Sequence, residues 1–316
     1  MTLSQLTRRE LLHLGLGAAI GLCSLEGSSQ FKSNSQSNTS AMMTRPIPKS
    51  GEGLPVVGLG TWQTFDLRGP GQEWNDAKEV LRLLVEHGGR VVDSSPMYGA
   101  SESVVGQMAA ELGIAKKLFL ATKVWTSGKQ SGIRQMEASM RKLRTDRLDL
   151  MQVHNLLDVQ TQLETLREWK KQGKVRYIGI THYSRSGYAE LERLMRSEGD
   201  LDFVQVNYSL AERDAEQRIL PTAKERKIAV LVNRPFATGQ LFGRARGKTL
   251  PQWAKEFDCT SWAQFFLKFI VGHPAVTCVI PATGDPKHLL DNMAAGSGRL
   301  PDDAMREKMV AYFESL

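Results

Sequence analysis

The segment Val91-Val92-Asp93-Ser94-Ser95-Pro96-Met97-Tyr98-Gly99 is the stretch of this chain that says most about its fold. It begins with a β-branched run that predicts a short buried strand, and it ends in turn-forming residues. An acid, Asp93, closes the strand, and a phenol, Tyr98, follows five residues later. The reactive groups are therefore expected at the end of a strand and in the loop after it.

The next two predicted strands also end in reactive side chains. Lys123 lies near the end of Leu120-Ala121-Thr122-Lys123-Val124-Trp125, and His154 closes Leu150-Met151-Gln152-Val153-His154. A tyrosine titrates near pH 10, and an ammonium about 4 Å away favours the phenolate by up to ~4 kcal/mol at an effective dielectric constant near 20. A carboxylate would hold the lysine charged, and a histidine would orient a carbonyl oxygen.

Each of these four residues also has an ordinary structural explanation. Asp93 could cap a turn, Lys123 could be a solvated surface charge, His154 a hydrogen-bonded core histidine and Tyr98 a loop aromatic. Their occurrence in order at consecutive strand ends favours a shared proton-transfer site instead.

Strands and helices are predicted to alternate from about residue 54 onward. The predicted strands are 55–61, 90–94, 118–124, 148–154, 177–181, 203–208, 229–233 and 277–281. The predicted helices are 75–87, 101–112, 131–143, 160–172, 186–196, 214–226, 260–272 and 285–294, with a last helix at 302–313.

Eight such units over roughly 260 residues are typical of an α/β fold of the (β/α)8 TIM barrel class. An open doubly wound sheet is the alternative. The barrel is favoured because its C-terminal rim would bring residues from the second, third and fourth strands together. We expect a single domain at 44–316 with an extra C-terminal helix.

Composition limits the possible partners of this 316-residue chain. The formal net charge of +7 comes from scattered, short basic clusters without interleaved aromatics, so no nucleic-acid partner is expected. The six histidines show no metal-ligand spacing, and three cysteines provide no disulfide framework. No metal is therefore expected.

The first forty residues differ in character from the rest. Arg8-Arg9 precedes an apolar stretch from Leu11 to Leu25, a pattern typical of a bacterial twin-arginine (Tat) export signal. The stretch is short and rich in glycine, so no stable membrane span is expected in the mature form. We assign 1–26 to the signal and 27–43 to a disordered polar linker, and expect the Tat machinery as a partner and a periplasmic or exported location. A fortuitous Arg-Arg pair would leave the protein cytoplasmic.

The tetrad and several other segments resemble the aldo-keto reductases, which are barrel enzymes that reduce carbonyls with a nicotinamide cofactor. Gly58-Leu59-Gly60-Thr61-Trp62 is similar to the family's first-strand segment beside the nicotinamide. Thr181 and His182 stand where the family binds the carboxamide, with His182 replacing an asparagine, and Gln205 matches a glutamine of the same site. The resemblance implies catalytic roles for Asp93, Tyr98, Lys123 and His154.

Departures from the family pattern concern the cofactor. Asn233 replaces an aromatic that stacks on the nicotinamide, and Arg234 could hold a phosphate or pair with a carboxylate at the rim. The resemblance implies that Pro235, Phe236, Gly239, Thr283, Lys287, His288, Asp291 and Asn292 also contact the cofactor. NADP(H) is expected and NAD(H) is possible, because the family's usual lysine and arginine are Ala282 and His288 here.

The expected activity is NAD(P)H-dependent reduction of an aldehyde or ketone, with Tyr98 as the general acid and base. A short loop after His154 predicts an open substrate site, with Trp62 and Trp125 as its walls. The alternative is a non-catalytic protein of the same fold that senses or regulates through a bound nicotinamide. A barrel hydrolase using Asp93 and His154 lacks a nucleophile and a metal site.

Overall fold

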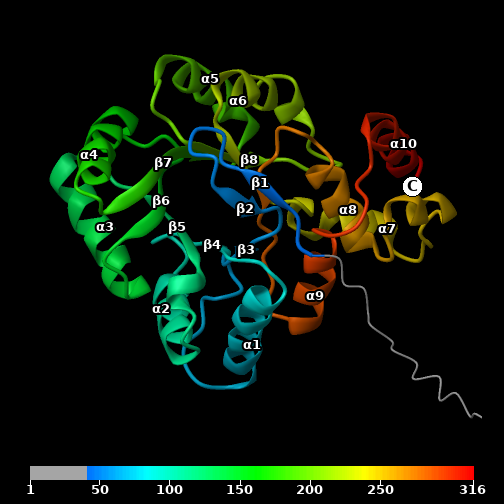
Figure 1. Cartoon of the computed structure of the whole chain (residues 1–316), viewed down its shortest axis with the longest axis horizontal. Helices are drawn as coiled ribbons and strands as arrows, with labels where there is room; N and C mark the ends of the chain where they lie inside the picture. The colour runs from blue at the N-terminus through cyan, green and yellow to red at the C-terminus, as the bar shows by residue number, and fades with distance from the viewer. Residues whose placement is uncertain (1–40) are drawn as a thin grey trace, which may run out of the picture. The chain divides into compact units, whose positions relative to one another are not determined.

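Eight parallel strands close into a barrel in the computed structural model, which describes residues 41–316 (Figure 1). In order, the strands are β3 (Leu59–Gly60), β4 (Val91–Asp93), β5 (Phe119–Val124), β6 (Leu148–His154), β7 (Val175–His182), β8 (Phe203–Asn207), β9 (Ala229–Asn233) and β10 (Cys278–Val279). Two isolated bridges, Val57 to Val279 and Gly60 to Ala282, join the segment around β3 to the segment around β10 and so close the barrel. The predicted (β/α)8 barrel is confirmed, and the open sheet is wrong.

Helices surround the barrel, as Figure 1 shows. They are α1 (Gln72–Glu86), α2 (Ser101–Glu111), α3 (Lys129–Leu143), α4 (Val159–Lys171), α5 (Tyr188–Ser197), α6 (Ile219–Arg226), α7 (Gln240–Ala245), α8 (Trp262–Val271), α9 (Pro286–Ala294) and α10 (Asp303–Glu314). The side chains of Ser261, Asp285 and Asp302 cap the last three of these, because each accepts a hydrogen bond from a first-turn amide. The extra C-terminal helix was predicted at 302–313, and α10 occupies that position.

An antiparallel hairpin, β1 (Thr44–Pro46) and β2 (Gly53–Pro55), precedes the barrel and was not predicted. Figure 1 shows it lying over the centre of the barrel. Ile47 and Leu54 belong to the same buried cluster as the inward-facing Phe119 and Phe203, so the hairpin closes the N-terminal end of the barrel interior. The predicted first strand was wrong at its start, because Pro55 pairs with Thr44 and the barrel strand begins only at Leu59.

Other parts of the structure also differ from the sequence predictions; α6, for example, begins at Ile219 and not at residue 214. The packed structure begins before Thr44, because the Met43 amide donates to the Gly296 carbonyl, the Met43 carbonyl accepts from the Val56 amide, and the side chain packs against the core. The helix α7 lies between the predicted strand 229–233 and the predicted helix 260–272, where no helix was predicted. The predicted signal at 1–26 and nearly all of the predicted linker lie outside the described residues.

The loop that carries Tyr98 is fixed by its neighbours. Gly99 has a positive φ of 59°, and a Cβ there would lie 2.2 Å from the Asp66 carboxylate. That carboxylate accepts a 2.8 Å hydrogen bond from the Ala100 amide. Glycine is therefore required at this position, and the turn after Tyr98 is held against the loop that follows β3.

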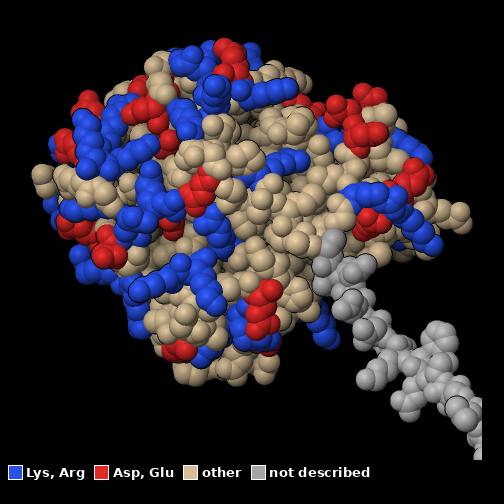
Figure 2. All heavy atoms as spheres, viewed as in Figure 1, with Lys and Arg blue, Asp and Glu red and all other residues tan. Residues whose placement is uncertain are grey.

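The outer surface carries both signs of charge. On the face in Figure 2, basic side chains are interspersed with acidic ones and do not gather into one patch. Glu52, for example, pairs with both Arg90 and Arg176. Among residues 41–316, no helix is long and apolar enough to cross a membrane, and no cluster of three potential metal ligands occurs.

Candidate active site

A cavity of about 510 Å³ opens at the end of the barrel where the strands terminate in Asp93, Val124 and His154. Active sites of barrel enzymes lie at this C-terminal end. The cavity is lined by Gly60, Thr61, Trp62, Asp93, Met97, Tyr98, Lys123, Trp125, His154, Asn155, Thr181, Tyr183, Gln205, Asn233, Arg234, Thr238, Ile280 and Ala282. All four residues of the predicted tetrad therefore face one cavity.

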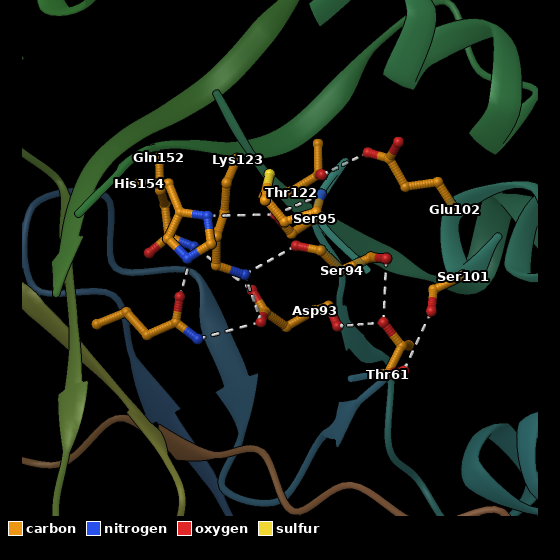
Figure 3. Close-up of polar contacts among 12 residues, drawn as sticks. Thr61, Asp93, Ser94, Ser95, Ser101, Glu102, Thr122, Lys123, Gln152 and His154 are labelled. Atoms are coloured by element: carbon orange, nitrogen blue, oxygen red, sulfur yellow. Dashed lines mark hydrogen bonds and ion pairs between the residues drawn. The ribbon is translucent and has the colours of Figure 1, made fainter. Parts of the chain in front are cut away.

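Lys123 and Asp93 form a buried ion pair at the bottom of this cavity. Lys123 Nζ donates to Asp93 Oδ2 at 2.7 Å and to the Ser94 carbonyl at 2.8 Å (Figure 3). Burial alone would lower the pKa of Lys123, but Asp93 and Tyr98 outweigh it and raise the pKa above its ordinary value. The lysine is thus held as a cation.

Two glutamines complete the surroundings of Asp93. Gln205 Nε2 donates to Asp93 Oδ2 at 3.1 Å, and Gln152 Nε2 donates to Gln205 Oε1 at 3.0 Å. All three side chains are buried. Gln152 was not among the predicted site residues, although a lone amide inside the apolar strand β6 is a signal for a buried polar network. Gln205 was expected to face a cofactor, and it lines the cavity while its amide also donates to Asp93.

Tyr98 lies beside the cation, with Lys123 Nζ 5.1 Å from the centre of its ring. Burial raises the pKa of Tyr98 above its ordinary value of 10.0, and Lys123 opposes that shift without reversing it. The expectation that Lys123 would bring the phenol's pKa down overlooked this burial. Tyr98 is consequently a neutral phenol at pH 7, which is the form that can give a proton.

His154 lies between two aromatic rings. Its ring centre is 6.3 Å from that of Tyr98, at 86°, and 6.4 Å from that of Trp125, at 60°. Burial, and then the nearby Lys123 cation, lower the pKa of His154 to about 3. The imidazole is neutral at physiological pH and has one N–H to donate and one nitrogen to accept.

The predicted cofactor residues fall into two groups. Gly60, Thr61, Thr181, Gln205, Asn233 and Arg234 line the cavity. The others lie outside its lining: His182, Pro235, Phe236, Gly239, Thr283, Lys287, His288, Asp291 and Asn292.

Several members of the second group have structural contacts of their own. Phe236 packs against Phe242, with ring centres 4.9 Å apart. Asp291 accepts hydrogen bonds from Ser261 and Gln264, so its carboxylate joins α9 to α8. At the start of α9, the Asp285 carboxylate accepts from the Lys287 amide. A phosphate at this helix end would lie close to that carboxylate.

Arg234 contacts a carboxylate at the rim. Its guanidinium lies 3.4 Å from Glu212, and its backbone has a positive φ of 49°. The sequence left a phosphate and a rim carboxylate as alternative partners, and the second is the contact present in the structure. Arg234 Nε has no hydrogen-bond partner within residues 41–316, so this guanidinium retains a free donor.

Aromatic and apolar side chains form the outer walls of the cavity. Trp62 is 46% exposed, and Trp125 is held through its backbone by Gln135. Both were predicted as walls, and both line the cavity. Met97 and Tyr183, which the sequence analysis did not identify, are exposed there as well.

The chain belongs to the aldo/keto reductase family, since the family model matches residues 56–309. It is 30% identical over 267 residues to the methylglyoxal reductase YeaE of Escherichia coli strain K12, a match that covers 80% of this chain and 89% of that protein. It is also 30% identical to the aldo-keto reductase YhdN of Bacillus subtilis over 203 residues, which is 60% of each chain.

Solved structures share the architecture. An aldo/keto reductase from Klebsiella pneumoniae, in complex with NADP and acetate, has a TM-score of 0.72 and 25% identity, covering 86% of this chain and 95% of that one. The glycerol dehydrogenase AKR11B4 from Gluconobacter oxydans has a TM-score of 0.71 at 22% identity, covering 86% and 95%, and supports the fold alone.

The cavity fits a nicotinamide group. Its volume lies within the range of small-molecule sites, and its walls combine aromatic surface with few polar groups. Two buried acceptors in the lining, Asn155 Oδ1 and Asn233 Oδ1, have no hydrogen-bond partner within the described part of the chain. Such groups are costly unless a ligand or water satisfies them, and a carboxamide and a ribose offer suitable donors.

Proposed function

We propose that this protein reduces aldehydes or ketones to alcohols with NADPH. One observation carries the proposal: a buried Lys123–Asp93 ion pair lies beneath Tyr98, and Tyr98 and His154 face the same cavity. An arrangement of this kind provides a proton donor and a carbonyl-orienting group side by side.

The four residues divide the work on the carbonyl oxygen. His154 donates a hydrogen bond to the oxygen and orients it, and Tyr98 gives that oxygen its phenolic proton. Lys123 stabilises the phenolate left behind, and Asp93 keeps Lys123 charged and in place. The bound cofactor supplies the hydride.

The cavity residues Thr181, Gln205 and Asn233 would hold the nicotinamide end of the cofactor. Arg234 and the start of α9, with Thr283, Lys287 and His288, would hold its phosphates. NADPH is favoured because the Klebsiella pneumoniae relatives are described in complex with NADP and NADPH.

The substrate is a small, uncharged carbonyl compound with an apolar or aromatic group. The outer cavity is built from Trp62, Met97, Trp125 and Tyr183, which offer apolar surface and no charge. Only residues 155–158 separate β6 from α4, so no long loop covers this side. The similarity to methylglyoxal reductases supports a small substrate.

We also propose that the protein is exported in folded form by the Tat machinery, because Arg8-Arg9 precedes a short apolar stretch. This route carries folded proteins, so the cofactor would travel with the enzyme.

Fluorescence titration with NADPH and NADH, followed by turnover on a panel of small aldehydes, tests the proposed activity. We expect tighter binding of NADPH than of NADH. Tyr98→Phe should bind NADPH like the wild type and lose at least about 100-fold in kcat, the usual contribution of a general acid. Binding without Tyr98-dependent turnover would instead support a nicotinamide sensor, and no binding of either nucleotide would refute the proposal.

A further inference from the structure

A serine outside the tetrad touches the imidazole that orients the substrate. Ser95, in the loop after β4, places its Oγ 3.3 Å from Nδ1 of His154 at the end of β6, as the dashed line in Figure 3 marks. Ser95 is completely buried, with 0% of its surface exposed. The serine hydroxyl is therefore shielded from solvent on its own side of this contact.

The direction of this hydrogen bond follows from the other contact of Ser95. The Met97 amide donates to Ser95 Oγ at 3.3 Å, which uses one acceptor position of the hydroxyl. Within residues 41–316, the side chain of Ser95 has no hydrogen-bonding neighbour other than Met97 N and His154 Nδ1. If the imidazole donated to Ser95, a fully buried hydroxyl proton would have no acceptor, which is a costly arrangement. The hydroxyl therefore donates and Nδ1 accepts.

This direction decides which nitrogen of His154 carries its proton. A neutral imidazole has one N–H, and when Nδ1 accepts a hydrogen bond the proton lies on Nε2. The imidazole of His154 has no hydrogen-bond partner besides Ser95 in the described part of the chain, so Nε2 is free for a ligand in the cavity that His154 lines.

We propose that Ser95 is a positioning residue that holds His154 in its Nε2–H tautomer and fixes the plane of the ring, so that Nε2–H points to the substrate carbonyl. The inference rests on the proposed carbonyl reduction for its consequence, but the tautomer itself is a property of the protein alone. Ser95 acts through His154 and does not touch the reacting atoms.

Nitrogen-15 NMR of the imidazoles in the protein without nucleotide tests the tautomer directly. Protonated and unprotonated ring nitrogens give well-separated resonances, and His154→Gln identifies the signals of His154. We expect Nε2 to be protonated and Nδ1 to be a hydrogen-bonded acceptor. In Ser95→Ala, the His154 signals should move toward a mixture of tautomers, and Ser95→Thr, which keeps the hydroxyl, should restore them.

Kinetics of the same variants tests the role in catalysis. Ser95→Ala should lower kcat/KM for an aldehyde by about 3- to 10-fold, the effect of one modest hydrogen bond, with unchanged NADPH affinity. Ser139→Ala is the matched control, because Ser139 is a buried serine in α3 whose hydroxyl has no partner among the described residues. It should change neither the His154 signals nor kcat/KM.

The outcomes separate the two proposals. A wild-type spectrum with the proton on Nδ1 would overturn the inference, even if Ser95→Ala did not fold. Unchanged signals and unchanged kcat/KM in Ser95→Ala would overturn it as well. If the spectrum shows the expected tautomer but the protein turns over no aldehyde, the role of Ser95 in positioning the ring is supported and the proposed reduction is refuted.

Discussion

Lys123 Nζ lies 2.7 Å from Asp93 Oδ2, although the two side chains are only 1% and 3% exposed. A buried ion pair of this kind adds little to stability over apolar packing, because both charges lose their hydration. Its presence at the end of the barrel therefore points to a chemical purpose, and it makes both partners sensitive to replacement.

Removal of one partner of this ion pair should lower the stability of the protein more than removal of both charges. Lys123→Met leaves Asp93 as an unpaired buried charge, so we expect a loss of about 3–5 kcal/mol in the free energy of unfolding. Lys123→Met combined with Asp93→Asn should regain much of that stability without regaining turnover. Urea denaturation and aldehyde turnover measure the two effects.

The exposed pair between Lys78 and Glu111 offers a control for this comparison. Lys78→Met should cost less than about 1 kcal/mol, as exposed pairs do. A single Lys123 variant as stable as the wild type would contradict the assignment of a tightly coupled buried pair.

The rate of reduction should be independent of pH around neutrality and should fall at alkaline pH. Burial raises the pKa of Tyr98, so the phenol keeps its proton through neutral pH and loses it only in the alkaline range. His154 takes up a second proton only near its pKa of about 3. We expect kcat/KM for reduction to be level from pH about 5 to 9 and to fall above about 10. An inflection near pH 6.5 would show instead that an ordinary histidine controls the reaction.

Stability should depend on pH through His154 as well. Its pKa falls from 6.5 to about 3 on folding, so between these values the unfolded chain binds a proton that the folded protein does not. The contribution of His154 to the unfolding free energy is therefore complete above pH 6.5 and is lost as the pH falls toward 3. His273, whose pKa burial lowers to about 4, adds to the same trend.

Urea midpoints at pH 5 and pH 7.5 test this linkage. His154→Gln cannot titrate, so the difference between the two midpoints should be smaller in that variant than in the wild type. Equal differences in both proteins would mean that His154 is protonated in the folded state at pH 5.

The pairing of Arg234 with Glu212 should influence cofactor affinity. Glu212→Gln releases the guanidinium for a phosphate, so we expect NADPH to bind a few-fold more tightly. Arg234→Met should weaken NADPH binding and reduce its dependence on salt. Titrations at low and high ionic strength measure both effects. Equal NADPH affinity in Arg234→Met and the wild type would show that this arginine serves the rim pair alone.

The twin arginine can be tested without any enzymatic assay. Replacement of Arg8-Arg9 by Lys-Lys should keep the protein in the cytoplasm of a bacterium with a working Tat system, because that machinery reads the arginine pair. Cell fractionation followed by immunoblotting gives the distribution. An unchanged distribution would indicate that the pair is fortuitous.

The fold was predictable because the information for it is local. Short apolar strands, amphipathic helices and reactive side chains at strand ends are each visible within a dozen residues. The hairpin β1–β2 was not predictable in this way, since Ile47 and Leu54 find their apolar partners only inside the assembled barrel.

The same distinction applies to the site. The positions of Asp93, Lys123 and His154 in their strands could be predicted from the sequence, but their surroundings could not. The contacts of Gln152 with Gln205 and of Ser95 with His154 join residues 53 and 59 positions apart. The direction of the Tyr98 pKa shift depends on how completely the phenol is buried, which no residue pattern specifies.

The seam between β3 and β10 has a consequence for biosynthesis. Gly60, from the first barrel strand, and Ala282, from the segment after the last one, meet in a bridge and both line the cavity. During translation, the cavity therefore lacks a wall until residue 282 has left the ribosome, long after the tetrad has been made. A nucleotide can be enclosed in the complete cavity only after that point, near the end of the synthesis of the 316-residue chain.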